Sequence, residues 1–158
     1  MIIKFCGFKT ESDIKKIRKL EVDAVGFIHY PDSKRHVSLK QLKYLAKIVP
    51  DHIEKVVVVV NPQISTIKRI INQTDINTIQ LHGNESIQLI RNIKKLNSKI
   101  RIIKAIPATR NLNNNIQKYK DEIDMFIIDT PSITYGGTGQ SFDWKLLKKV
   151  KDVDFLIA

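Results

Sequence analysis

The sequence predicts an α/β fold in which parallel strands alternate with helices. Short runs rich in β-branched residues alternate along the chain with segments of helical periodicity, for example Ile14, Ile17 and Leu20. Two of the runs, VVVVV at 56–60 and MFII at 125–128, are continuously apolar, as expected for parallel strands covered on both faces. The predicted strands begin every ~22 to 31 residues, which is the length of a strand followed by a helix.

We expect seven strands, at residues 2–6, 24–29, 55–60, 78–82, 100–105, 125–129 and 154–158. Six helices lie between them, and residues that commonly cap helices mark several of their starts. Thr10 or Ser12 precedes the first helix, and Ser38 precedes the second. Asn84 is expected to cap the fourth helix, with Glu85 in its first turn.

The order of these elements does not decide between an open parallel sheet and a closed barrel. An open doubly wound sheet usually ends on a helix that covers its last strand, whereas this sequence ends on a strand. An eight-stranded barrel needs one more strand, and such barrels have about 200 residues or more. Because there is no internal linker or low-complexity tract, we expect residues 1–158 to form a single domain.

The net charge of +11 raises the question of nucleic-acid binding. A nucleic-acid-binding protein usually gathers Lys and Arg on one face, with aromatic residues between them. Here the basic residues recur along every predicted helix, which favours solvent-exposed helix faces over a binding stripe. The charge would also attract an anionic substrate. We therefore expect no nucleic-acid partner.

The only cysteine, Cys6, cannot form an internal disulfide, which fits a reducing compartment such as the cytoplasm. There is no stretch of about 18 apolar residues, and the N-terminus lacks the pattern of a signal peptide. The sequence therefore indicates neither secretion nor membrane insertion.

Cys6 and Asp129 are the candidate catalytic residues, because each ends a predicted strand. In parallel α/β proteins the active site lies at the carboxyl ends of the strands. Cys6 could instead be a small buried hydrophobic residue, since free cysteine is among the most buried residue types. Asp129 could be a helix cap or a turn residue, although the next helix begins only near Asp143. A reactive Cys6 needs positive charge nearby, and Lys4 lies on the same face of its strand.

Two further strand ends carry candidate binding residues. Arg35 lies in the basic loop YPDSKRH at 30–36, where its guanidinium group could pair with a substrate carboxylate; otherwise the loop is simply solvated. His82 shares one face of its strand with Gln80 and precedes a glycine. It could act as a base, donate a hydrogen bond or be a satisfied core histidine, and the last two interpretations together are favoured over the base.

A long polar loop from Thr130 to Phe142 follows Asp129. Loops of this length between packed elements are usually functional. Its small residues do not match a nucleotide-binding P-loop or a dinucleotide fingerprint, and they could also simply make turns. A lid or a cradle of backbone N–H groups over a substrate fits better. The residues concerned are Gly136, Gly137, Thr138 and Gly139.

Five motifs follow one another in the chain: KFCG at 4–7, VGFIHYPDSKRHVS at 25–38, VVVVVN at 56–61, IQLHG at 79–83, and IIDT with GGTGQSFDW within 127–144. Together they resemble the phosphoribosylanthranilate isomerases of tryptophan biosynthesis, and the resemblance covers essentially the whole chain. Members of that family are eight-fold βα barrels (TIM barrels). The resemblance therefore implies an incomplete (β/α)8 barrel, with strands 1–7 and helices 1–6 present.

The implied reaction is an Amadori rearrangement of N-(5'-phosphoribosyl)anthranilate. By resemblance, Asp129 takes the place of the general acid that opens the sugar ring, and Cys6 takes the place of the general base at C2. Arg35 falls where the family holds the anthranilate carboxylate. From their positions in the chain, His82 and the loop residues Gly136, Gly137, Thr138 and Gly139 are expected to contact substrate. No cofactor and no metal is implied, and no Cys and His spacing suggests a metal site. The expected partner is a small phosphorylated substrate, and the protein would be a monomer or homodimer in the cytoplasm.

The sequence departs from the family pattern in three places. His29 stands where the family commonly has an aromatic residue, and His36 differs from a usual tyrosine-like neighbour. After the last strand the family continues into two further βα loops that hold the substrate's phosphate. Taken as 158 residues, the chain is therefore expected to bind substrate poorly and to expose the edges of strands 1 and 7.

Two other functions stay open at this point. Another phosphosugar barrel, an isomerase or epimerase, would use other catalytic groups, commonly metal-binding histidines or a lysine with a glutamate. The pair of Cys6 and Asp129 disfavours that alternative. A basic nucleic-acid-binding α/β module is disfavoured because the positive charges are dispersed.

Overall fold

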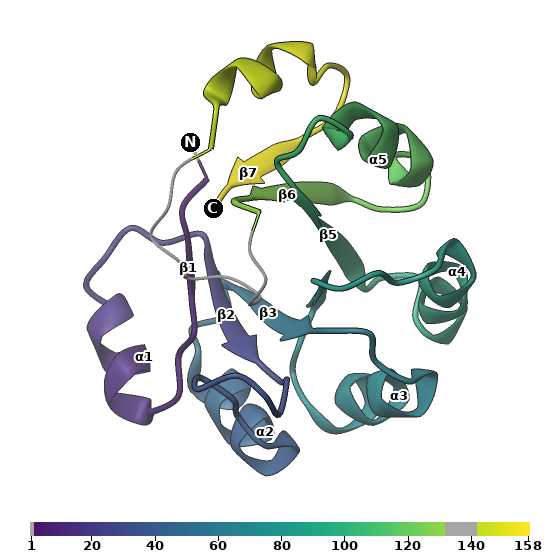
Figure 1. The fold of residues 1–158 in the computed structure, drawn as a ribbon. Coiled ribbons are helices and arrows are strands. Elements are labelled where there is room, and N and C mark those ends of the chain that lie inside the picture. Colours follow the sequence, from purple (N-terminus) through teal and green to yellow (C-terminus); the bar gives the residue numbers. More distant parts are fainter. Residues whose placement is uncertain (1, 132–141) are drawn as a thin grey trace.

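The computed structural model describes residues 2–131 and 142–158, and its strands form one parallel sheet in sequential order. The strands are β1 (Lys4–Cys6), β2 (Ala24–Ile28), β3 (Glu54–Val59), β4 (Thr78–Leu81), β5 (Arg101–Pro107), β6 (Met125–Asp129) and β7 (Phe155–Ile157). Figure 1 shows them around a common centre with the helices outside. Within the described residues β1 pairs only with β2 and β7 only with β6, so the barrel is open between β1 and β7. The predicted fold class, an incomplete (β/α) barrel, is confirmed.

The helices occupy the intervals between the strands, as the periodicity predicts. They are α1 (Glu11–Ile17), α2 (Leu39–Ile48), α3 (Ile64–Gln73), α4 (Ile87–Leu96), α5 (Leu112–Tyr119) and the 3-10 helix η1 (Trp144–Lys149). The sixth predicted helix is therefore a short 3-10 helix, which begins after the N-cap residue Asp143. No helix in the described part of the chain is long and apolar enough to cross a membrane.

Side-chain caps fix where three of the α-helices begin. Thr10, one of the two predicted candidates, caps α1, and Ser38 caps α2 as predicted. Each belongs to a complete capping box. The prediction for α4 is wrong, because Ser86 rather than Asn84 is its N-cap. The turn after β4 is longer than expected, since Glu85 turns inward and is buried instead of starting the helix.

Two apolar layers cover the two faces of the sheet. On β5, Ile102 and Ile106 belong to the large outer layer between the strands and the helices. Ile103, which points to the opposite face, packs with Met125 and Ile127 inside the barrel. This alternation follows from the two-residue period of a strand, and burial on both faces explains the continuously apolar runs of the sequence.

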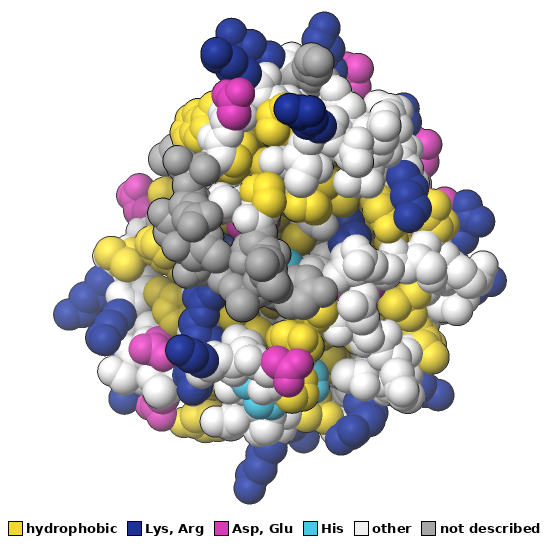
Figure 2. All heavy atoms as spheres, viewed as in Figure 1, with side chains coloured by type: hydrophobic (Ala, Val, Ile, Leu, Met, Phe, Trp, Pro, Cys, Tyr) yellow, Lys and Arg dark blue, Asp and Glu magenta, His cyan; other side chains and the backbone are white. Residues whose placement is uncertain are grey.

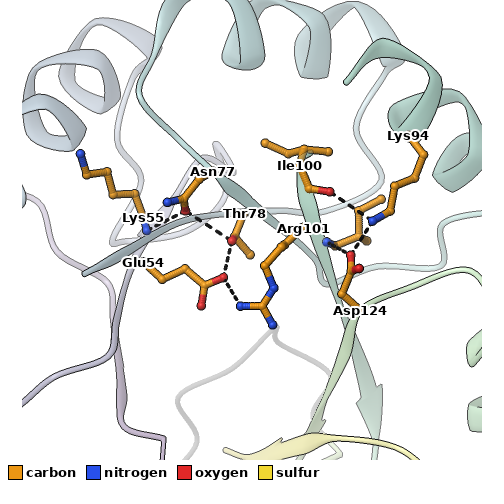
Figure 3. Close-up of polar contacts among 9 residues, drawn as sticks. Glu54, Lys55, Asn77, Thr78, Lys94, Ile100, Arg101 and Asp124 are labelled. Atoms are coloured by element: carbon orange, nitrogen blue, oxygen red, sulfur yellow. Dashed lines mark hydrogen bonds and ion pairs between the residues drawn. The ribbon is translucent and has the colours of Figure 1, made fainter. Parts of the chain in front are cut away.

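Polar residues close the barrel at the amino ends of the strands (Figure 3). A side chain directly before β2, β4 and β6 accepts a hydrogen bond from a backbone N–H at the preceding strand. The pairs are Asp23 with Ile3 (2.7 Å), Asn77 with Lys55 (2.9 Å) and Asp124 with Ile102 (2.7 Å). In addition, Arg101 pairs with Glu54 across this end, with Nη1 and Oε1 2.6 Å apart. This rim is therefore held by hydrogen bonds and ion pairs, which leaves the opposite rim for a site.

Candidate active site

A pocket of about 160 Å³ opens at the carboxyl ends of the strands. All four described residues that the sequence singled out for catalysis or binding line it, although they come from distant parts of the chain. They are Cys6, Arg35, His82 and Asp129. The other candidates, Gly136, Gly137, Thr138 and Gly139, lie outside the described residues.

Cys6 ends β1 and is exposed to the pocket, so it is not the small buried hydrophobic residue of the alternative interpretation. Lys4 lines the same pocket two residues earlier. Both side chains lie over Gly26 of β2: a methyl group added there would be 2.7 Å from Cys6 Sγ and 3.2 Å from Lys4 Nζ. Glycine at position 26 therefore makes room for a thiol with an ammonium group beside it.

Asp129 ends β6, and its carboxylate is held by a short hydrogen-bond relay from β4. His82 Nε2 lies 3.1 Å from Asp129 Oδ2, and Gln80 Nε2 lies 3.0 Å from His82 Nδ1. Because the Gln80 amide nitrogen can only donate, His82 Nδ1 accepts and Nε2 carries the proton that it donates to Asp129. The side chains of His82 and Asp129 are only 15% and 14% exposed. Of the three interpretations of His82, the geometry favours the hydrogen-bond donor.

Arg35 reaches the pocket from the loop between β2 and α2. Its Nη1 donates to the carbonyl oxygen of Cys6 at 3.2 Å, which places the guanidinium group at the end of β1. This approach depends on Gly7, where a methyl group would lie 2.6 Å from Arg35 Nη1. Gly7 also has φ +98°, a backbone conformation that glycine adopts readily and other residues avoid. A cation is thus fixed at the end of the strand that carries the thiol.

An apolar wall, which the sequence reasoning did not predict, completes the pocket. It consists of Ile28, Val58, Val60 and Ile127. The two-residue period of a strand could have identified part of it, because Ile127 is on the same face of β6 as Asp129. Such a wall provides a surface for an aromatic ring and excludes water from the polar groups.

The two histidines at which the sequence departs from the family pattern stack behind the Arg35 loop. The rings of His29 and His36 are 5.3 Å apart, and His29 Nδ1 donates to the carbonyl of Val37 at 2.8 Å. Burial, together with the neighbouring His29, lowers the pKa of His36 below its usual range. A neutral His36 is therefore favoured, and the stacked rings support the loop that carries Arg35.

The surface around the pocket carries charges of both signs. In Figure 2 the Lys and Arg side chains are spread around the periphery, with Asp and Glu among them. On the described part of this face they do not gather into a stripe of the kind that binds nucleic acid. The pocket therefore suits a small ligand, with acid, thiol and cations at its walls.

Comparisons with known proteins identify the family of this chain. The profile of the family described as N-(5'phosphoribosyl)anthranilate (PRA) isomerase matches residues 3–158. An N-(5'-phosphoribosyl)anthranilate isomerase of Staphylococcus epidermidis is 97% identical over all 158 residues, which span 76% of its length. The crystal structure of phosphoribosyl anthranilate isomerase from Thermotoga maritima is 31% identical, with a TM-score of 0.81 over 93% of this chain and 70% of that one. A second isomerase structure, in complex with reduced 1-(o-carboxyphenylamino)-1-deoxyribulose 5-phosphate, is 29% identical, with a TM-score of 0.77 over 94% and 69%. The chain therefore belongs to the N-(5'-phosphoribosyl)anthranilate isomerase family and is an isomerase of tryptophan biosynthesis.

Proposed function

We propose that Cys6 and Asp129 are the base and the acid that rearrange N-(5'-phosphoribosyl)anthranilate to 1-(2-carboxyphenylamino)-1-deoxyribulose 5-phosphate. The observation that carries the proposal is that the thiol at the end of β1 and the carboxyl group at the end of β6 line one pocket. An aldose-to-ketose rearrangement needs an acid at the ring oxygen and a base at C2, and these two residues supply both.

Asp129 acts first, as the general acid. Its carboxyl proton goes to the furanose ring oxygen, the bond between C1 and that oxygen breaks, and the nitrogen lone pair forms a C1=N double bond. Asp129 is left as a carboxylate, which accepts the hydrogen bond from His82 Nε2. The relay from Gln80 and His82 therefore stabilises the charge that develops on the acid during ring opening.

Cys6 acts second, as the general base. Its thiolate takes the proton from C2, and the electron pair of that C–H bond forms a C1=C2 double bond while the iminium nitrogen becomes neutral. Loss of the C2 hydroxyl proton and protonation at C1 then give the ketone. C1 is reduced and C2 is oxidised within one molecule, so the balance needs no external oxidant or reductant.

Arg35 and Lys4 bring positive charge to the side of the pocket where Cys6 lies. The Arg35 guanidinium group offers a planar pair of donors for the anthranilate carboxylate, and the apolar wall offers a surface for the aromatic ring. Lys4 lies beside Cys6 over Gly26, where an ammonium group offsets the charge of a thiolate. The site thus suits a small anionic molecule such as the proposed substrate.

The test measures turnover of N-(5'-phosphoribosyl)anthranilate by Cys6→Ser and Asp129→Asn proteins. Each variant is expected to lower kcat by about 10²- to 10⁴-fold, the usual contribution of one general acid or base. Asp75→Asn, at an exposed position outside the pocket, is the control for the loss of a carboxylate and should keep full turnover.

Growth of a tryptophan auxotroph that lacks this isomerase provides a second measurement. It is run with the 158-residue chain and with the chain continued by the further residues of the Staphylococcus epidermidis relative. We expect at least the longer protein to restore growth and both active-site variants of it to fail. If Cys6→Ser and Asp129→Asn both retain turnover, the assignment of base and acid is wrong.

A further inference from the structure

A buried ion pair lies next to the active site, on the other face of the sheet. Lys104 of β5 and Glu85 after β4 are 2% and 0% exposed, and Lys104 Nζ lies 3.0 Å from Glu85 Oε2. Tyr119 of α5 covers the pair: its ring is 5.7 Å from Lys104 Nζ, and its hydroxyl donates to the Glu85 carbonyl at 2.9 Å. Neither charged residue lines the pocket, so the reaction does not use them directly.

Lys104 donates to the backbone on both sides of His82. Its Nζ lies 3.3 Å from the carbonyl oxygen of Leu81 and 2.7 Å from that of Gly83. These carbonyls belong to the residues on either side of His82, so one ammonium group fixes the direction of the backbone from which the His82 ring projects.

Glu85 holds the same turn from its other oxygen. Its Oε1 accepts hydrogen bonds from the backbone N–H of Gly83 at 2.8 Å and of Asn61 at 3.0 Å. Asn61 follows β3, next to Val60 in the apolar wall of the pocket. The ion pair therefore joins the turns after β3 and β4 into one unit.

We propose that Lys104 and Glu85 are positioning residues that hold the His82 imidazole against the carboxyl group of Asp129. The proposal rests on the role proposed above for Asp129, because His82 matters to turnover only if Asp129 is the acid. The two residues act through the backbone of Leu81, His82 and Gly83 and touch no substrate.

Packing alone does not explain a lysine at position 104. Burial lowers the pKa of the Lys104 ammonium group below its usual value, although the Glu85 carboxylate opposes that shift. Desolvation of the charge thus exceeds its attraction to Glu85, and a buried ion pair of this kind is weak evidence for stability. An apolar residue would fill the place in this apolar strand. What it would lack are the N–H donors to the carbonyls beside His82.

The test compares Lys104→Met with Arg101→Met, a matched change three residues earlier on β5. Arg101 also belongs to an ion pair, with Glu54, but at the amino ends of the strands (Figure 3). Both variants remove a cation from an ion pair. Only Lys104→Met removes donors from the backbone that carries His82.

The readout is the ¹⁵N NMR spectrum of the His82 ring, assigned by comparison with His82→Asn. A single tautomer held against Asp129 gives two well-separated ring nitrogen signals. We expect these signals to move toward each other in Lys104→Met, because the released ring samples both tautomers, and to stay in place in Arg101→Met. Unmoved His82 signals in folded Lys104→Met protein overturn the proposal.

A second variant covers the case in which Lys104→Met does not fold because it leaves the Glu85 charge buried and unpaired. Lys104→Met/Glu85→Gln removes both charges, and the glutamine oxygen still accepts from Gly83 N and Asn61 N. The donors to the two carbonyls are absent in this protein too, so the same movement of the His82 signals is expected. Wild-type signals in the folded double variant overturn the proposal.

Turnover separates this proposal from the proposed function. Lys104→Met should lower kcat by about tenfold or more with little change in KM, because a displaced His82 affects the acid and not the binding of substrate. An equal loss of kcat in Arg101→Met contradicts the positioning role. If Asp129→Asn keeps full turnover, the role of Asp129 is wrong, while the NMR result still decides whether Lys104 holds His82.

Discussion

Gly26→Ala is expected to displace the thiol of Cys6, the proposed general base, while leaving the fold in place. Gly26 is the register partner of Cys6 on the neighbouring strand β2. The added methyl carbon would lie 2.7 Å from Cys6 Sγ and 3.2 Å from Cys6 Cβ. Non-bonded heavy atoms pack at about 3.5–4.0 Å, so the sulfur must move by about 1 Å.

The two consequences of this movement differ in size. Sγ ends a short side chain at the pocket, so it can rotate away, at a cost of about 1 kcal/mol for an unfavourable rotamer and about 1–3 kcal/mol with the crowding included. For catalysis the same 1 Å matters more, because misplacing a reacting group by that distance costs about 10²-fold in rate. We therefore expect a modest loss of stability and a hundredfold loss of kcat.

The assay combines turnover, chemical denaturation and the alkylation rate of Cys6, the only cysteine in the chain. Ala46→Val serves as the control, because it crowds a fully buried site on α2 that does not line the pocket. It should lower the free energy of unfolding by a similar amount and leave kcat and the alkylation rate unchanged. A folded Gly26→Ala protein with the kcat of the wild type would show that the position of the Cys6 sulfur does not limit turnover.

Three further changes test other parts of the structure. Arg35→Met should raise KM about tenfold to a hundredfold in steady-state kinetics, because the substrate carboxylate loses a charge-assisted pair of hydrogen bonds; an unchanged KM would remove Arg35 from the binding site. Asp124→Ala should lower the free energy of unfolding by about 1–3 kcal/mol in urea denaturation, since it leaves the Ile102 N–H without its acceptor, and kcat should not change. The lowered pKa of His36 means that the unfolded chain binds a proton more readily than the folded one, so stability should fall as the pH drops below about 6.5. His36→Phe should weaken this dependence, measured as melting temperature against pH, and a curve identical to the wild type would contradict it.

The sequence predicted the rim of the barrel better than its interior. Every predicted strand is present, with ends within two residues of those observed. For β2, β3 and β6 the reason is that burial on both faces leaves long apolar runs in the sequence. Because the carboxyl ends of parallel strands lie at one edge of the sheet, residues at those ends could be assigned to one rim of the barrel. Cys6, His82 and Asp129, which are far apart in the chain, therefore lie at one pocket as expected.

The wrong cap predicted for α4 and the missed ion pair of Lys104 and Glu85 share a cause. Asn84 looks like a helix cap and Glu85 like a first-turn acid, yet Glu85 is buried and Ser86 caps the helix. Glu85 turns inward to pair with Lys104, which lies on another strand. Periodicity and capping residues within one element cannot predict a pair between two elements. The signal was a single lysine inside the apolar run RIIKAIP, which could equally have marked a strand end.

The side chains that accept a hydrogen bond from the neighbouring strand at the amino ends recur at every second strand, which predicts where the chain can be circularly permuted. Asp23 joins β1 to β2, Asn77 joins β3 to β4, and Asp124 joins β5 to β6, so the sheet is assembled from strand pairs. New termini placed between two pairs, after α2 or after α4, keep both members of each pair on a continuous piece of chain. Circular permutants opened there should refold more readily than permutants opened after α1, α3 or α5, where the cut separates an acceptor from its donor.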